Sequence, residues 1–369
     1  MKVDAFTETI VPKPLLESAR CANETHLGCA DETCVLAEYF CDGSNDCADS
    51  SDEGWCDISY DPNGALPCDP GLCLLPNCFC TKNGTDTPGN LVPSQTPQMI
   101  TLTFDGPVNH ENWDIYTKQL LNADRKNPNG CPIKATFFVS HPYTNYRHVQ
   151  KLWNDDHEIA VNSITNRGPA EWWSKNATVE DWFDEMVGQA NIINRFGRVW
   201  MEEFRGMRVP HYSVGWNRQF LMMQEFGFVY DATAVAPLSD PPFWPKQPVL
   251  SNQKLCWLVG DGDKPAQTRR TYVSHTTRFT SELLKLPDVY FVTYREVIDW
   301  MKRPTPVIQL KKFQPWQCNN KRFQDSEIAC QKPNTCKLPS KVLEHDKYMI
   351  TCIDCPKSYP WIRNEFGVE

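Results

Sequence analysis

The sequence predicts an α/β protein whose parallel sheet is closed or nearly closed into a barrel, preceded by a small disulfide-rich module. Short runs of alternating apolar residues recur through residues 98–293. An amphipathic helical pattern lies between these runs, and six cysteines crowd into residues 21–56. Because strands that alternate with helices pair in parallel, we expect helices to cover the sheet.

Period-two apolar patterns locate the strands, and a period near 3.6 locates the helices. The expected strands cover residues 98–105, 134–141, 157–163, 203–208, 227–231 and 289–293. A helix is expected over 179–193, where Thr178 and Asp181 provide an N-terminal capping pair and Gly197 a stop signal. A second helix is expected to follow the last strand and to reach Met301.

The cysteine content indicates an oxidising compartment. The chain has 17 cysteines, many in closely spaced groups, and three N-glycosylation sequons at Asn23, Asn83 and Asn176. Residues 1–20 have no apolar core of signal-peptide length, so the extracellular location is inferred from the cysteines. No apolar run reaches the ~18 residues of a membrane span, and none is expected.

The acidity of the chain belongs to one module. Residues 21–56 contain nine of the 46 Asp and Glu and none of the 37 Lys and Arg. The other 37 acidic residues equal the basic residues in number. This balance argues against a nucleic-acid-binding surface.

The acidic module resembles the LDL-receptor class A repeat in its six cysteines and in its closing sequence, residues 41–53. The resemblance implies a calcium cage, and clustered carboxylates are ligands that Ca²⁺ prefers. The implied ligands are the carboxylates of Asp42, Asp46, Asp52 and Glu53 and the backbone carbonyls of Tyr39 and Ser44. The implied disulfides are Cys21–Cys34, Cys29–Cys47 and Cys41–Cys56. The alternative is an acidic loop that binds no metal.

Two further cysteine groups suggest either zinc ligands or structural disulfides. One lies in the Pro- and Gly-rich connector 57–97, and the other is the pair Cys352 and Cys355 near the C-terminus. The connector has no histidine, and the disulfide-rich context favours structural disulfides for both groups. For the pair near the C-terminus, a redox function is a further alternative.

Two strand ends carry the most informative motifs. Thr103–Gly106 reads TFDG, and Asn162–Asn166 reads NSITN. They resemble the T-F-D-D and H-S-x-x-H motifs of the polysaccharide deacetylases, which include the chitin deacetylases of arthropods and nematodes. The resemblance covers roughly residues 57–369 and includes the segments 126–131, 138–141 and 288–293 in the family's order. It implies the distorted (β/α) barrel of that family.

The resemblance implies a role for each matching position. Asp105 matches the general base, but the positions of the three zinc ligands are Gly106, Asn162 and Asn166, which we expect to hold no zinc. Glycine has no side chain, and amide oxygens are poor zinc donors beside imidazole or carboxylate.

Two further segments match the family in part. In the segment R-V-P-H, Arg208 would orient the catalytic Asp, and Pro210 and His211 would line the substrate groove. His275 is the candidate counterpart of the catalytic histidine, in a region, 244–288, that is shorter than in the family. Cys256 is the candidate unpaired thiol.

The favoured interpretation is a secreted, catalytically inactive deacetylase homologue that binds chitin or another N-acetylglucosamine polymer of the extracellular matrix. One alternative is an active metal-dependent N-deacetylase with an altered site. Another is an extracellular adaptor whose acidic repeat binds a lysine of a partner protein. Trp172 and Trp173 suggest core packing, which we favour, or sugar stacking. The expected divisions are a leader or linker (1–20), the repeat (21–56), the connector (57–97), the deacetylase-like domain (98–303) and a Cys-rich extension (304–369).

Overall fold

The chain forms two compact units, residues 1–65 and 66–369. The structure is a computed structural model. It describes residues 21, 26–29, 31, 33–36, 39, 44–54, 71, 73–79, 84–235, 241, 243–245, 257–258, 277–318, 330–340 and 345–368. Several residues named above lie outside the described residues, namely Asn23, Cys41, Asp42, Cys56, Asn83, Cys256, His275 and the side chain of Glu53.

The first unit contains a short antiparallel hairpin and one helical turn. Strand β1 (His26–Gly28) pairs with β2 (Cys34–Leu36), and α1 (Ser51–Gly54) follows. Disulfides join Cys21 to Cys34 and Cys29 to Cys47, which are two of the pairings that the resemblance implies. Covalent links of this kind are how a segment with so small an apolar core keeps its fold.

The second unit is built on a parallel sheet. Its strands are β3 (Gln98–Ile100), β4 (Thr103–Gly106), β5 (Thr136–Val139), β6 (Glu158–Val161), β7 (Gly206–Met207), β8 (Tyr230–Asp231), β9 (Trp257–Leu258) and β10 (Val289–Phe291). Strands β4 to β9 are hydrogen-bonded in chain order, and β10 pairs with β3, all in parallel. Since β3 leads directly into β4, the order continues from β10 through to β9. Within the described residues β9 and β10 do not pair, so barrel closure stays a prediction.

Helices connect the strands and cover the sheet. The α-helices are α2 (His110–Asp114), α3 (Tyr146–Asn154), α4 (Val179–Trp182), α5 (Gly188–Gly197), α6 (Trp216–Phe226) and α8 (Tyr294–Lys302). The π-helical segments are η6 (Ile115–Leu120), η7 (Trp172–Asn176) and η8 (Phe183–Val187). The 3₁₀ turns are η4 (Pro88–Asn90), η5 (Pro93–Gln95), η9 (Met201–Glu203), η10 (Pro210–Tyr212), η11 (Val307–Lys312) and η12 (Gln314–Trp316).

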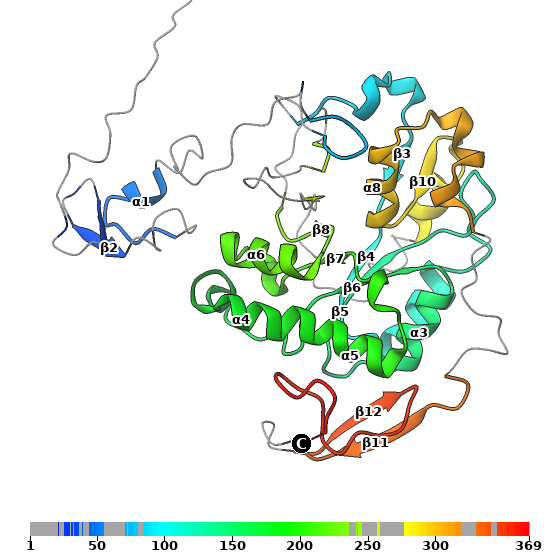
Figure 1. Ribbon diagram of the computed structural model, residues 1–369. Helices are drawn as coiled ribbons and strands as arrows, with labels where there is room; N and C mark the ends of the chain where they lie inside the picture. Colours follow the sequence, from blue (N-terminus) through cyan, green and yellow to red (C-terminus); the bar gives the residue numbers. More distant parts are fainter. Residues whose placement is uncertain are drawn as a thin grey trace, which may run out of the picture. The chain divides into compact units, whose positions relative to one another are not determined.

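The two faces of the strands bury different apolar clusters. Phe137 and Val139 of β5 pack into the larger cluster with residues of α3 and α5. Phe138, between them, packs into a second cluster with residues of β8, β10 and α8. This alternation is the period-two geometry of a strand that is buried on both sides. Figure 1 shows α3, α4 and α5 together along one side of the sheet, and α8 beside β10 and β3 on the other.

The expected elements are present, although the strands are shorter than predicted. The expected strand 98–105 is divided into β3 and β4, and 203–208 contributes only the two residues of β7. The helix expected over 179–193 is confirmed as α4, η8 and α5 in succession. It begins with the predicted capping box, in which Thr178 and Asp181 exchange hydrogen bonds, and it ends at Gly197.

The C-terminal segment of the second unit packs against the helices that cover the sheet. Strands β11 (Asn334–Leu338) and β12 (Lys347–Thr351) form an antiparallel hairpin held by the disulfides Cys330–Cys352 and Cys336–Cys355. Cys352 and Cys355 are thus not bonded to each other.

The Nε2 atom of buried His141 donates to the carbonyl of Pro360 (2.9 Å). Burial without a compensating charge lowers the pKa of His141 to about 3, so this imidazole is neutral at physiological pH.

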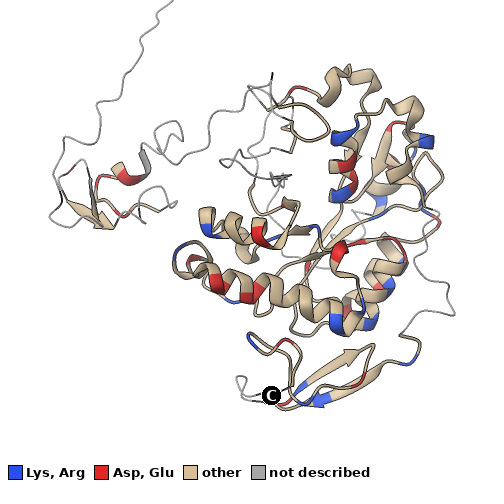
Figure 2. Cartoon of the chain, in the orientation of Figure 1, with Lys and Arg blue, Asp and Glu red and all other residues tan. Residues whose placement is uncertain are grey.

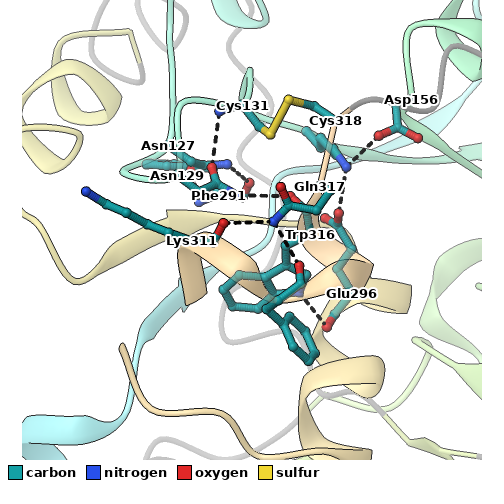
Figure 3. The surroundings of a disulfide bond; sticks show 12 residues. Asn127, Asn129, Cys131, Asp156, Phe291, Glu296, Lys311, Trp316, Gln317 and Cys318 are labelled. Atoms are coloured by element: carbon teal, nitrogen blue, oxygen red, sulfur yellow. Dashed lines mark hydrogen bonds and ion pairs between the residues drawn. A yellow bond between two sulfur atoms is a disulfide. The ribbon is translucent and has the colours of Figure 1, made fainter. Parts of the chain in front are cut away.

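The Cys131–Cys318 disulfide ties the residues that follow α8 to the beginning of the sheet domain (Figure 3). Asn129 Nδ2 donates to the carbonyl of Trp316 (2.9 Å). Nearby, the side chain of Asn127 both donates to and accepts from the backbone of Phe291 in β10, as a neighbouring strand would. Residues 126–131 therefore have a structural function, because they fix β10 and the segment that follows α8.

Charges of both signs are interspersed along the helices of the second unit, in agreement with the balance found outside residues 21–56 (Figure 2). Among the described residues, no helix has both the length and the apolar character that a membrane crossing requires.

Gly206 makes room for the ring of Tyr230, with which it is paired in the sheet. A Cβ atom at position 206 would overlap this ring. Tyr230 is fully buried and its hydroxyl donates to Glu158 Oε1 (2.9 Å), so the ring has little freedom to move aside. We expect Gly206→Ala to lower the free energy of unfolding by about 1–3 kcal/mol or more, measured by denaturant titration.

Gly197→Ala is the matched control. Its added Cβ would meet its nearest neighbour, Tyr146, at an ordinary 3.6 Å. An equal loss of stability in both variants would contradict the crowding argument.

Candidate functional site at the carboxyl ends of the strands

Polar residues from the ends of three strands of the same sheet come together at one edge. Asp105 belongs to β4, Asn162 follows β6 and Arg208 follows β7. Asp105 is opposite Phe138 in the sheet register, so its side chain leaves β4 on the same face as the Phe138 ring. We call Asp105, Asn162, Asn166, Arg208 and Tyr212 the strand-end site.

Arg208 is the fixed centre of this site. Its guanidinium is 1% exposed and lies over the Phe138 ring, with Cζ 4.2 Å from the ring centroid. Its nitrogens donate to the carbonyl of Ala232 (2.8 Å), the hydroxyl of Thr103 (3.1 Å), Asp105 Oδ1 (2.9 Å) and the hydroxyl of Tyr294 (3.2 Å). Four acceptors around one buried cation leave it a single orientation.

Asp105 is held on both of its oxygens. Arg208 binds Oδ1, and the hydroxyl of Tyr212 donates to Oδ2 (3.3 Å). The carboxylate remains 34% exposed, so one side of it faces solvent. Asp105 is thus an anchored anion at the surface, with a buried positive charge beneath it.

The aromatic residue that reaches Asp105 is Tyr212 and not its neighbour His211. The chain turns at Pro210, and both His211 and Tyr212 take a left-handed backbone conformation, with φ of 61° and 57°. Through this turn the exposed His211 ring donates from Nε2 to the carbonyl of Arg167 (3.1 Å), while Tyr212 lies beside Asp105. The sequence analysis placed His211, directly after Pro210, in the groove and did not single out Tyr212, whose approach to Asp105 depends on the left-handed turn.

Asp231 is a second carboxylate near Arg208 that the sequence did not single out. It is fully buried at the end of β8 and accepts hydrogen bonds from the hydroxyl and the backbone N–H of Thr233. Burial raises its pKa to about 6, against the opposing effects of these hydrogen bonds and of the charge of Arg208. The Thr233 hydroxyl also accepts from the N–H of Val209 (3.0 Å), so Asp231 and Thr233 support the segment that carries Arg208.

Glu185 holds the loop that follows β6 through hydrogen bonds and an ion pair. Both carboxylate oxygens of this buried residue bind Thr165, at Oγ1 (2.5 Å) and at the backbone N–H (2.9 Å). Arg167 pairs with the same carboxylate (3.2 Å). Within this frame Trp173 is completely buried, as core packing predicts, whereas Trp172 is half-buried with the Arg167 guanidinium 4.2 Å from its ring centroid.

The three positions that match zinc ligands present no set of zinc donors. Gly106 has φ of +101°, a conformation that residues with a side chain rarely adopt. Asn162 is buried and its Nδ2 donates to the carbonyl of Arg208 (3.0 Å), while its Oδ1 has no hydrogen-bond partner. Asn166 is exposed. Zinc requires thiolate, imidazole or carboxylate, so these residues do not fit this metal.

Nowhere in the described parts of the chain do three or more His, Cys, Asp or Glu side chains gather in a way that could hold a metal ion. Cavities of about 200 and 350 Å³ lie next to Lys134 and His157, before β5 and β6, away from the strand ends that carry Asp105.

Four of the expected calcium ligands, Tyr39, Ser44, Asp46 and Asp52, lie among the described residues of the first unit. Asp52 is buried, and its Oδ2 accepts from the N–H of Asp46 (2.5 Å). Tyr39 and Ser44 are half-buried. Since Asp42 and the side chain of Glu53 are outside the described residues, the complete ligand set stays a prediction.

Comparison with known proteins adds three findings. The family model described as low-density lipoprotein receptor domain class A matches residues 19–56. Chitin deacetylase 1 of Bombyx mori is 37% identical, in an alignment that covers 96% of this chain and 79% of that protein. Chitin deacetylase 8 of the same organism is 30% identical, over 82% of this chain and 94% of that protein.

Because Arg208 is buried, we expect removal of its acidic partner to cost more folding stability than removal of an acidic residue from an exposed ion pair. Asp105→Ala removes the carboxylate from a guanidinium that is almost fully buried, and we expect it to lower the free energy of unfolding by about 1–3 kcal/mol. Asp114→Ala removes a carboxylate from a pair with Lys118 in which both side chains are more than half exposed. That change should cost less than about 1 kcal/mol. Denaturant midpoints of the two variants test this, and equal losses would show that the buried ion pair is not stabilising.

Proposed function

Because this chain belongs to the chitin deacetylase family, we propose that it binds chitin or a related N-acetylglucosamine polymer and does not deacetylate it. One observation carries the proposal. Arg208 still anchors Asp105 (2.9 Å), but the positions that would hold zinc are Gly106, Asn162 and Asn166. The anchor for the anion has remained while the donors for the metal have been replaced.

Amide hydrolysis by this family depends on the missing donors. A bound metal supplies an activated water and polarises the acetyl oxygen, and a carboxylate then acts as the base. In this chain Asp105 is already engaged by Arg208 and Tyr212. Without a metal-bound water, Asp105 has no acidic proton donor to act on. Catalytic inactivity follows as part of the proposal.

Binding of a sugar polymer needs less than catalysis does. Sugars are held by hydrogen bonds to fixed polar groups and by contact with aromatic rings. The exposed side of Asp105 and the phenol oxygen of half-buried Tyr212, whose one O–H proton is donated to Asp105, offer hydrogen-bond acceptors on rigid supports. Trp216 is 49% exposed at the start of α6, four residues after Tyr212. Contacts spread in this way survive the loss of one metal.

We also propose that the protein is extracellular and that its class A domain binds Ca²⁺. Six disulfides in the described residues favour an extracellular protein, where such bonds persist. Asp52 is buried in the class A domain, and residues 21–56 of that domain have neither Lys nor Arg to compensate its charge. A bound Ca²⁺ is the compensating charge that we propose there.

The central prediction is binding without turnover. The purified chain should co-sediment with chitin and release no acetate from soluble chitin oligomers, because sugar contacts are distributed whereas hydrolysis depends on the metal. Asp105→Ala should weaken co-sedimentation with chitin. Asp114→Ala, which removes only an exposed ion pair with Lys118 outside the strand-end site, should leave co-sedimentation unchanged. Acetate release that chelators suppress would establish the altered-enzyme alternative. Neither binding nor turnover would favour the adaptor alternative.

Restoring the donors is a gain-of-function extension of this test. The triple variant Gly106→Asp, Asn162→His, Asn166→His should bind zinc, measured by elemental analysis after dialysis. The double variant Asn162→His, Asn166→His is the control and should bind zinc more weakly. Because φ at Gly106 is +101°, the added Asp should cost about 1–3 kcal/mol of folding stability. Stoichiometric zinc in the unmodified chain would contradict the proposal.

If the class A domain binds Ca²⁺, removal of calcium should destabilise the first unit alone. In the full chain, residues 21–56 should resist proteolysis in Ca²⁺ and become cleavable in excess chelator, because ligand binding stabilises only the folded form. Asp52→Ala should make this segment cleavable even with Ca²⁺. Asp31→Ala, which removes an exposed acid bonded to Thr33, should not. Equal protection with and without calcium would refute the cage.

A further inference from the structure

The sequon at Asn176 is the one of the three whose asparagine the structure describes, and its geometry is that of a glycan acceptor. Asn176 ends η7, and the chain then runs in extended conformation through Ala177 and Thr178 before α4 begins. Asn176 and Thr178 are exposed, whereas Ala177 between them is completely buried. The sequon therefore presents its two recognition residues to solvent on a backbone that is fixed from beneath.

The amide of Asn176 is also chemically available. Among the described residues its side chain takes part in no hydrogen bond, ion pair or ring contact. Arg218 of α6 holds this turn through its backbone, by donating to the carbonyls of Ser174 (2.7 Å) and Lys175 (2.8 Å), and does not engage the Asn176 amide. A substituent on Nδ2 would displace no contact of the fold.

We infer that Asn176 carries an N-linked glycan. The disulfides of the chain indicate passage through an oxidising secretory compartment, where the transfer takes place. In the transfer, the amide nitrogen Nδ2 forms a bond to the anomeric carbon of a lipid-linked oligosaccharide. The Nδ2–H proton is lost and the lipid pyrophosphate leaves. The inference does not depend on chitin binding or on the state of the strand-end site.

Thr178 has two functions in this account, and mutations can separate them. Its hydroxyl is the third position of the sequon, and it also caps α4 by accepting from the N–H of Asp181 (3.2 Å). Serine keeps both functions. Asparagine keeps a side-chain oxygen that caps a helix but destroys the sequon, so it removes the glycan without removing the cap.

The test is peptide mapping of the full chain secreted from a eukaryotic host. Treatment with a peptide-N-glycosidase in heavy-oxygen water should convert Asn176 into an Asp that carries the heavy isotope. Asn176→Gln and Thr178→Asn should lose the modification while the protein remains secreted, and Thr178→Ser should keep it. An unmodified Asn176 in the secreted, disulfide-bonded chain would overturn the inference, whether or not Asn23 and Asn83 are modified.

Discussion

The ion pair between Arg208 and Asp105 is the constraint on which the strand-end site depends. A guanidinium that is 1% exposed must find acceptors for its N–H groups, and it finds them on Thr103, Asp105, Ala232 and Tyr294. These acceptors come from β4 and from the segments that follow β8 and β10. One buried cation thus connects the ends of strands that are more than 180 residues apart in the sequence. A substitution at Asp105 is therefore expected to change the stability of the fold as well as any binding at this site.

This constraint offers a physical reason why the strand-end site is ordered although Gly106, Asn162 and Asn166 supply no thiolate, imidazole or carboxylate. The frame depends on Arg208, on the Asp231–Thr233 support and on Glu185 beneath the loop of residues 162–166. None of these contacts requires a metal. Asn162 is itself tied to the frame through the carbonyl of Arg208 (3.0 Å). A surface built in this way is suited to binding, because its polar groups are already oriented before a ligand arrives.

Much of the fold was predictable from local patterns. The strands, the helix that begins after Thr178 and ends at Gly197, and the acidic class A module follow from periodicity, capping residues and cysteine spacing. These signals are local because they depend on residues within a few positions of one another. The strand lengths were overestimated, since apolar alternation continues beyond the residues that form ladder hydrogen bonds.

The sequence by itself determined which chemical groups stand at the strand ends: a carboxylate at Asp105, no side chain at Gly106, and amides at Asn162 and Asn166. Only the tertiary structure decided which side chains meet. It brings Tyr212 to Asp105 in place of His211, buries Asp231 enough to raise its pKa, and joins Cys131 to Cys318. These outcomes depend on a left-handed turn, on depth in the core and on the register of distant strands. Such quantities arise when separate segments pack together, and no single segment carries them in its own sequence.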